Sequence, residues 1–232
     1  MEKIHRTKSI SIWIFIIPFI AINTCLVLIT QFQGLFPNQE DIVHNSLWPY
    51  LDGGLSISRA ARPYPSWFIF KPAMFLTSFL LVKYWYLNRD IIISFNKNHR
   101  HIKKIIFFGI ASAILLAIHS IFLGIKFEYD LYKLFRRVVL LSFIIFEVIA
   151  QTFLVLTLIE LKSKINSYIN KKFLKLKLIL VYTLIIVALF SIVLISLPGN
   201  KVIKHMLEWN YFLGVISFYI LTFFMWKNKK LY

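Results

Sequence analysis

The stretch VVLLSFIIFEVIAQTFLVLTLIEL, Val138–Leu161, decides the fold class of this chain. A bilayer core about 30 Å thick is crossed by a helix of about 20 predominantly apolar residues, and this stretch exceeds that length. Five further stretches have the same character. The expected spans are Ile10–Thr30, Trp67–Leu87, Ile105–Ile125, Val138–Leu161, Leu178–Leu197 and Tyr211–Trp226. The sequence therefore predicts an all-α, polytopic integral membrane protein with six transmembrane helices, in which residues 1–232 form a single transmembrane domain.

The composition supports this class and excludes others. The hydrophobic fraction of 59% lies above the roughly 45–50% of soluble domains, and the mean hydropathy is +0.71. The first span follows a short basic segment, as a signal peptide does, but it is too long for such a segment and Phe32–Pro37 shows no small-residue cleavage site. We expect it to remain as a helix. The single cysteine, Cys25, excludes an internal disulfide and a multi-cysteine metal site, and we expect no metal and no cofactor.

The basic residues indicate the topology. The net charge is +17, and the positive residues gather before the first span, in the second and fourth connections and after the last span. The positive-inside rule then places both termini in the cytoplasm and the first connection outside, where it carries Glu40, Asp41 and Asp52. The third connection, with Lys126, Lys133, Arg136 and Arg137, is basic yet external in this arrangement. We interpret the basic runs as topology signals and contacts with lipid head groups, and we expect no nucleic-acid partner. The richness in Ile, Lys, Asn and Phe suits a bacterium with an AT-rich genome, and we expect the protein in the bacterial cytoplasmic (inner) membrane.

The external first loop, residues 31–66, is too long for a simple connection between helices. Pro49 and the Gly53-Gly54 pair predict turns. The segment Ser56–Arg62 predicts a short helix with Ser56 or Asp52 as its N-cap. We therefore expect a folded element at the membrane surface.

This loop resembles part of a known family. The run Pro49-Tyr50-Leu51-Asp52-Gly53-Gly54-Leu55-Ser56-Ile57-Ser58, followed by Pro65, Phe68 and Tyr84-Trp85-Tyr86, is similar to the first extracytoplasmic loop and second helix of the FRAG/DRAM/SFK family. The resemblance implies about six spans with both termini inside, and a role in remodelling, sensing or distributing lipids. Family members often have an acidic residue soon after the proline of this loop, whereas here Trp67 follows Pro65-Ser66.

The same loop contains a candidate head-group site. Arg59 and Arg62 could bind a phosphate or carboxylate in bidentate fashion, with Asp52, Ser56 and Ser58 in the same segment. Alternatively, the two arginines only anchor the loop to lipid phosphates.

Ionisable groups within the spans are a second candidate site, because such groups are costly in lipid and usually face the bundle interior. Glu147 lies near the middle of the fourth span, and Gln151 follows one turn later on the same helix face. Lys71 beside Pro72 and His119 lie in the second and third spans. We expect Glu147, Lys71, His119 and Asn23 to form a polar cluster beneath the external loop. The alternatives are that Lys71 extends to the interface and that His119 is a hydrogen-bonded core residue.

Enzyme motifs are missing from the sequence. It contains no Gly-x-Ser-x-Gly, no His-Glu-x-x-His and no phosphate-binding glycine loop. We therefore favour a non-enzymatic, lipid-associated role, in which the protein binds, organises or moves lipid or a lipid-linked partner, and we name no catalytic residue. A membrane-embedded lipid-modifying enzyme, with Ser56 or Ser58 paired with His119, is the alternative, and a small permease is the third. Membrane lipids are the expected partners, and a protein partner or oligomer stays open.

Overall fold

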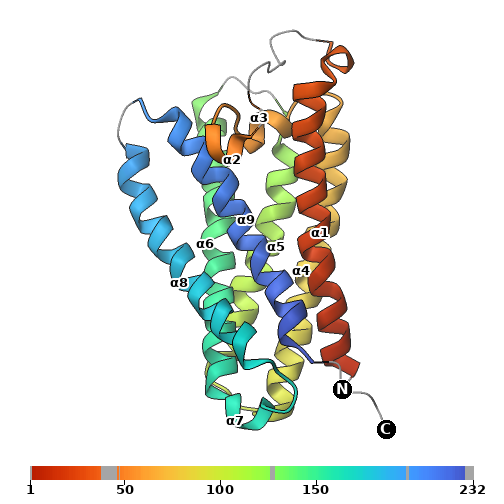
Figure 1. Ribbon diagram of the computed structural model, residues 1–232, viewed down its shortest axis with the longest axis vertical. Coiled ribbons are helices and arrows are strands. Elements are labelled where there is room, and N and C mark those ends of the chain that lie inside the picture. The colour runs from red at the N-terminus through yellow and green to blue at the C-terminus, as the bar shows by residue number, and fades with distance from the viewer. Residues whose placement is uncertain (1, 38–45, 47, 126–128, 197–198, 228–232) are drawn as a thin grey trace.

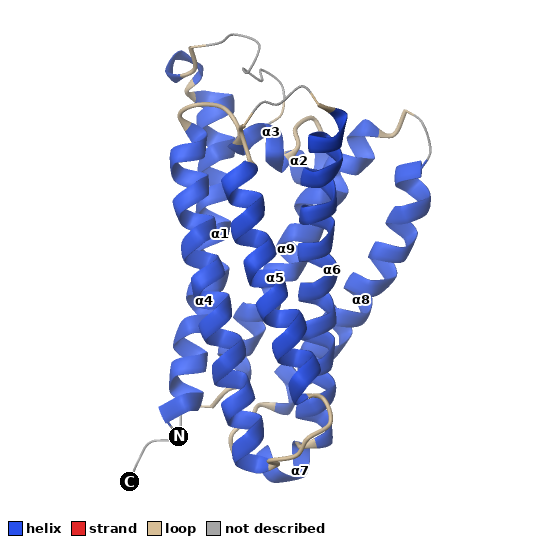
Figure 2. Ribbon diagram, turned by 180° about the vertical axis from the view of Figure 1, so that it is seen from behind, coloured by secondary structure: helices blue, strands red, loops and turns tan. Residues whose placement is uncertain are grey.

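The computed structural model describes residues 2–37, 46, 48–125, 129–196 and 199–227, and it confirms the all-α class (Figures 1 and 2). Six of its helices, α1, α4, α5, α6, α8 and α9, are long and apolar enough to cross a membrane. The described elements are α1 (Glu2–Gln31), the 3-10 turn η1 (Gln33–Leu35), α2 (Pro49–Asp52), α3 (Ile57–Ala61), α4 (Ser66–Phe95), α5 (Ile102–Phe122), α6 (Asp130–Glu160), α7 (Lys162–Ile165), α8 (Lys171–Ser196) and α9 (Lys201–Met225).

The long helices form one bundle with two distinct ends. Helix α1 begins and α9 ends at one of them, here called the termini end, where α7 also lies (Figure 1). The opposite end, here called the loop end, carries α2 and α3 (Figure 1). Toward the loop end α8 diverges from α6, and both views show this (Figures 1 and 2). The start of α1 and the end of α9 therefore lie on one side of the bundle, and the assignment of that side to the cytoplasm stays a prediction.

Several helices extend beyond the spans that hydropathy predicts. Helix α9 begins at Lys201 rather than Tyr211, and α8 begins at Lys171 rather than Leu178. Helix α6 begins at Asp130, so three basic residues assigned to the third connection, Lys133, Arg136 and Arg137, lie on its first turns. Hydropathy marks only the part of a helix that lies in hydrocarbon, whereas the backbone hydrogen bonds that define the helix continue beyond it. Glu40, Asp41 and Lys126, used in the topology argument, lie outside the described residues.

Close packing of α4 against α5 depends on a glycine. A Cβ atom at Gly109 would lie 2.5 Å from the indole of Trp85, and that indole is fully buried. Helices in lipid gain little from the hydrophobic effect and associate through close contact at small residues. The Gly109 site allows the largest side chain of the sequence to fill the space between the two helices.

The first loop folds onto the N-terminal turns of α9. The Trp209 indole donates a hydrogen bond to the carbonyl oxygen of Leu55 (2.7 Å), and the Asn210 amide donates to that of Tyr50 (2.8 Å). Gly53 ends α2 in the left-handed conformation (φ 58°), and a Cβ there would lie 2.1 Å from a backbone oxygen of α9. Only glycine satisfies both conditions.

The short helix predicted after this turn is present as α3. Ser56 is its N-cap, and the Ser56 hydroxyl accepts a hydrogen bond from the backbone N–H of Arg59 (3.2 Å). The following Ala60 and Ala61 are buried against the bundle. The described residues 48–62 of this loop thus form a packed cap over the loop end.

Candidate functional site

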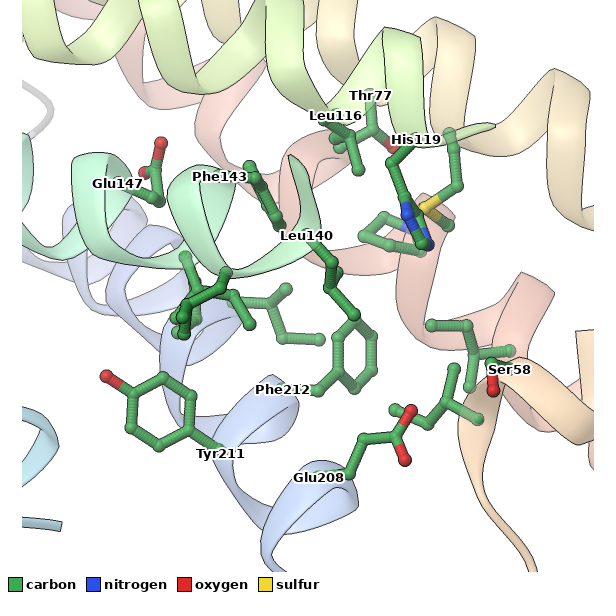
Figure 3. A pocket seen from close by; sticks show the side chains of 18 of the residues that line it. Ser58, Thr77, Leu116, His119, Leu140, Phe143, Glu147, Glu208, Tyr211 and Phe212 are labelled. Atoms are coloured by element: carbon green, nitrogen blue, oxygen red, sulfur yellow. The ribbon is translucent and has the colours of Figure 1, made fainter. Parts of the chain in front are cut away.

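A cavity of about 440 Å³ lies inside the bundle and is lined by residues of α1, α3, α4, α5, α6, α8 and α9 (Figure 3). Its walls are mostly apolar, with Leu140, Phe143 and Phe212 among them (Figure 3). Leu141 and Ile145 of α6 line it and are also exposed at the bundle surface, by 58% and 45%. Residues of α8 line it as well. The cavity therefore reaches the lipid-facing surface where α6 and α8 diverge.

The inner end of the cavity carries Glu147, which is 1% exposed. Its carboxylate is hydrogen-bonded to the Ser112 hydroxyl of α5 (2.6 Å), the Gln151 amide of α6 (3.0 Å) and the Tyr219 hydroxyl of α9. The Gln151 amide also donates to the carbonyl oxygen of Val215 (3.2 Å). Three helices thus supply the hydrogen bonds that a buried carboxyl group requires.

The polar cluster expected beneath the loop is only partly assembled. Lys71 donates to the carbonyl oxygen of Ile121 (3.2 Å) and lies over the ring of Trp67 (5.3 Å), so it is not among the partners of Glu147. Asn23 instead accepts a hydrogen bond from the Tyr50 hydroxyl (3.2 Å).

Of the four residues expected in that cluster, Glu147 and His119 line the cavity. The His119 side chain is 8% exposed and its ring reaches into the cavity (Figure 3). Its Nδ1 atom is buried and has no hydrogen-bond partner among the described residues. The Ser58 hydroxyl, which also lines the cavity, pairs with the hydroxyl of Ser56 (3.4 Å) and not with His119. The arrangement therefore offers an open hydrogen-bonding position at His119 rather than a serine–histidine pair.

The outer end of the cavity carries two charged residues that the sequence analysis missed. Lys204 and Glu208 of α9 both line it. The Glu208 carboxylate accepts hydrogen bonds from the backbone N–H groups of Ile57 and Ser58, at the start of α3. Residues four apart share one helix face, and this spacing was the available signal. It was overlooked because Lys204 and Glu208 precede the apolar stretch assigned to the last span.

The proposed head-group segment of the first loop divides into two parts. The Asp52 carboxylate is used within its own turn, where it accepts hydrogen bonds from the Ser46 hydroxyl (3.1 Å) and the backbone N–H of Gly54 (2.8 Å). Arg59 and Arg62 are exposed and do not line the cavity. Ser58 is the residue of this segment whose polar side chain lines the cavity.

A second buried polar group lies nearer the termini end. Lys177, assigned by sequence to a basic connection, is fully buried within α8. Its ammonium donates to the Thr222 hydroxyl (2.7 Å) and lies 3.7 Å from the ring centroid of Phe218. The Thr222 hydroxyl is also hydrogen-bonded to that of Tyr84 (3.1 Å). The hydropathy of the surrounding residues gave no sign that this lysine, among several, turns inward.

Within the described part of the chain, no group of three His, Cys, Asp or Glu side chains could hold a metal ion. Comparison with known proteins found no matching family, no matching curated protein and no matching solved structure.

Proposed function

We propose that this protein binds a membrane lipid, or a lipid-like amphiphile, in the cavity between its helices, and that it organises or moves that lipid without modifying it. The observation that carries this proposal is the cavity itself. It has apolar walls, it reaches the lipid-facing surface at α6, and it has polar groups at both ends. Its volume of about 440 Å³ falls in the range of about 300–1,000 Å³ that small-molecule pockets occupy.

Inside a bilayer, the hydrophobic effect contributes little to the binding of a lipid. An acyl chain in a bilayer is already surrounded by hydrocarbon, so its transfer into an apolar cavity gains little hydrophobic free energy. Affinity and selectivity must therefore come from shape and from the polar groups. Those groups include Glu147 at the inner end and Ser58, His119, Lys204 and Glu208 toward the loop end.

Two further observations bear on this proposal. The loop run Pro49–Ser58 resembles a family whose members remodel, sense or distribute lipids, which supports a lipid-associated role without deciding between binding and catalysis. The enzyme alternative needs an activated nucleophile near a base, but the Ser58 hydroxyl is hydrogen-bonded to Ser56 instead of His119. We further propose that the protein lies in the cytoplasmic membrane of a bacterium, which its composition suits, and that the loop end faces outward, which the distribution of basic residues favours.

The test is direct lipid binding to the purified protein in nanodiscs. A photoactivatable single-chain amphiphile should label the wild type saturably. Ala188→Phe places an aromatic ring in the cavity and should reduce labelling several-fold. Leu189→Phe, on an exposed side chain of the same helix, is the matched control and should label as the wild type does. Equal labelling of both variants would contradict the proposal.

A further inference from the structure

We infer that the lipid held in this cavity is a single-chain zwitterionic glycerophospholipid, with one acyl chain, a free glycerol hydroxyl, a phosphate and an ammonium group. This inference rests on the proposed function, because it names the chemical class of the ligand for the same cavity.

The size of the cavity favours one chain. A volume of about 440 Å³ lies in the lower half of the range of about 300–1,000 Å³ for small-molecule pockets. An apolar space with Leu140, Phe143 and Phe212 in its lining suits one hydrocarbon chain, which would extend from the loop end toward Glu147 (Figure 3).

The charges at the outer end favour a zwitterion. Lys204 and Glu208 line the same cavity from the same helix face, and one turn of helix often brings such a pair into contact. Here the Glu208 carboxylate is bonded to the start of α3 instead, and Lys204 has no ion pair among the described residues. A purely anionic head group would be attracted by Lys204 and repelled by Glu208. A head group with both charges can place its phosphate at Lys204 and its ammonium at Glu208.

The carboxylate of Glu208 has room for that ammonium. Two carboxylate oxygens offer about four acceptor positions, and the backbone N–H groups of Ile57 and Ser58 occupy two of them. A hydrogen bond from a primary ammonium, which is charged, would be stronger than the hydrogen bond from either backbone N–H group.

His119 favours a free hydroxyl on the ligand. Its Nδ1 atom is buried without a partner in the described structure, and a buried polar atom left unpaired is costly. A hydroxyl both donates and accepts, so it can satisfy a histidine nitrogen in either tautomer. A two-chain glycerophospholipid has no free hydroxyl on its backbone glycerol, whereas a single-chain one does. The ring of His119 and the carboxylate of Glu208 reach toward the outer part of the cavity from different helices, with Ser58 beside them (Figure 3).

The experiment compares head groups on one acyl chain. Wild-type protein in nanodiscs is titrated with lysophosphatidylethanolamine, lysophosphatidylglycerol and monoacylglycerol, which carry zwitterionic, anionic and neutral heads. We expect the zwitterion to bind about tenfold more tightly than either of the others, about 1.4 kcal/mol. A fourth ligand, the zwitterion without its glycerol hydroxyl, should bind several-fold more weakly.

The variants assign each contact. Lys204→Gln should weaken both phosphate-bearing lipids and leave monoacylglycerol unchanged, whereas Glu208→Gln should remove the preference for ethanolamine over glycerol. His119→Leu should abolish the difference between the hydroxyl and deoxy ligands. Lys201→Gln, an exposed lysine on the first turn of α9 that does not line the cavity, is the control and should bind as the wild type does.

The outcomes separate the inference from the proposed function. Equal affinity for all head groups, with Ala188→Phe still blocking binding, would overturn the inference and keep the proposed function. A failure of every single-chain amphiphile to bind saturably would overturn both. If Glu208→Gln lowers the unfolding temperature through its lost bonds to α3, Lys204→Gln decides the head-group question, and an unchanged phosphate preference in that variant overturns the inference.

Discussion

The amide of Gln151 donates to the carboxylate of Glu147 at 3.0 Å, one helical turn away on α6, and also to the Val215 carbonyl oxygen of α9 at 3.2 Å. The two side chains are 0% and 1% exposed. The Gln151 amide thus links α6 to α9 in the middle of an apolar bundle while it also holds the Glu147 carboxylate. Glu147 is therefore held by neighbours that donate to it, and a single substitution there affects α5, α6 and α9 together.

Glu147→Gln should keep the unfolding temperature close to that of the wild type, because the amide has the same shape and still hydrogen-bonds with Ser112 and Tyr219. Glu147→Leu leaves those hydroxyls and the Gln151 amide without their partner, which should cost about 3 kcal/mol or more. Thermal unfolding of both variants in detergent measures the difference. A leucine variant as stable as the glutamine variant would show that the hydrogen bonds do not hold the helices.

Thr222→Val should destabilise the protein by about 1–3 kcal/mol, because it leaves the buried ammonium of Lys177 and the hydroxyl of Tyr84 without a partner. Lys177→Met fills a similar volume and removes a fully buried amino group, so its stability should equal or exceed that of the wild type. The Lys177→Met, Thr222→Val double variant should therefore lose less than Thr222→Val does alone. A double-mutant cycle measured by thermal unfolding checks this, and strict additivity would exclude the coupling.

The unfolding temperature of the protein should fall as the pH is lowered from about 7 to 5, because of a histidine at the termini end. Burial, together with the neighbouring charge of Arg100, lowers the pKa of His101 from its usual value, and Arg100 donates to the Nε2 atom of the neutral ring (3.1 Å). Below the unfolded pKa of about 6.5, the unfolded chain binds this proton more readily than the folded one, so stability is lost as pH falls.

His101→Gln removes that titration and should flatten this part of the profile. The measurement is the unfolding temperature of both proteins across that range. An identical decline in the two proteins would assign the pH dependence to other groups.

The loop end should face away from the cytoplasm. In a Cys25→Ala background, a membrane-impermeant thiol reagent added to intact cells should label Tyr64→Cys, an exposed position of the first loop. Asn98→Cys, exposed in the connection between α4 and α5, should be labelled only after the membrane is permeabilised. Labelling of Asn98→Cys in intact cells would reverse the orientation derived from the basic residues.

Part of the candidate site is visible in the sequence. Glu147 and Gln151 are conspicuous because polar residues stand out in an apolar span, and their spacing of four places them on one face of the helix. His119 stands out for the same reason, whereas Ser58 was chosen as part of the head-group segment of the first loop. Lys71 was expected beside them, but it contacts the end of α5 instead, since a long side chain near a helix end has many directions open to it.

The amino-acid sequence by itself determined that the chain is a bundle of six membrane-crossing helices, because each span depends on the local average of apolar residues over about 20 positions. It likewise predicted the turn at Gly53-Gly54 and a short helix capped by Ser56 or Asp52, and the structure shows that Ser56 is the N-cap. Only the tertiary structure decided that Lys177 turns inward to Thr222 and that Lys204 and Glu208 share a cavity with His119. Those placements depend on how α5, α8 and α9 approach one another. Contacts between residues so far apart in the chain cannot be predicted from local sequence patterns.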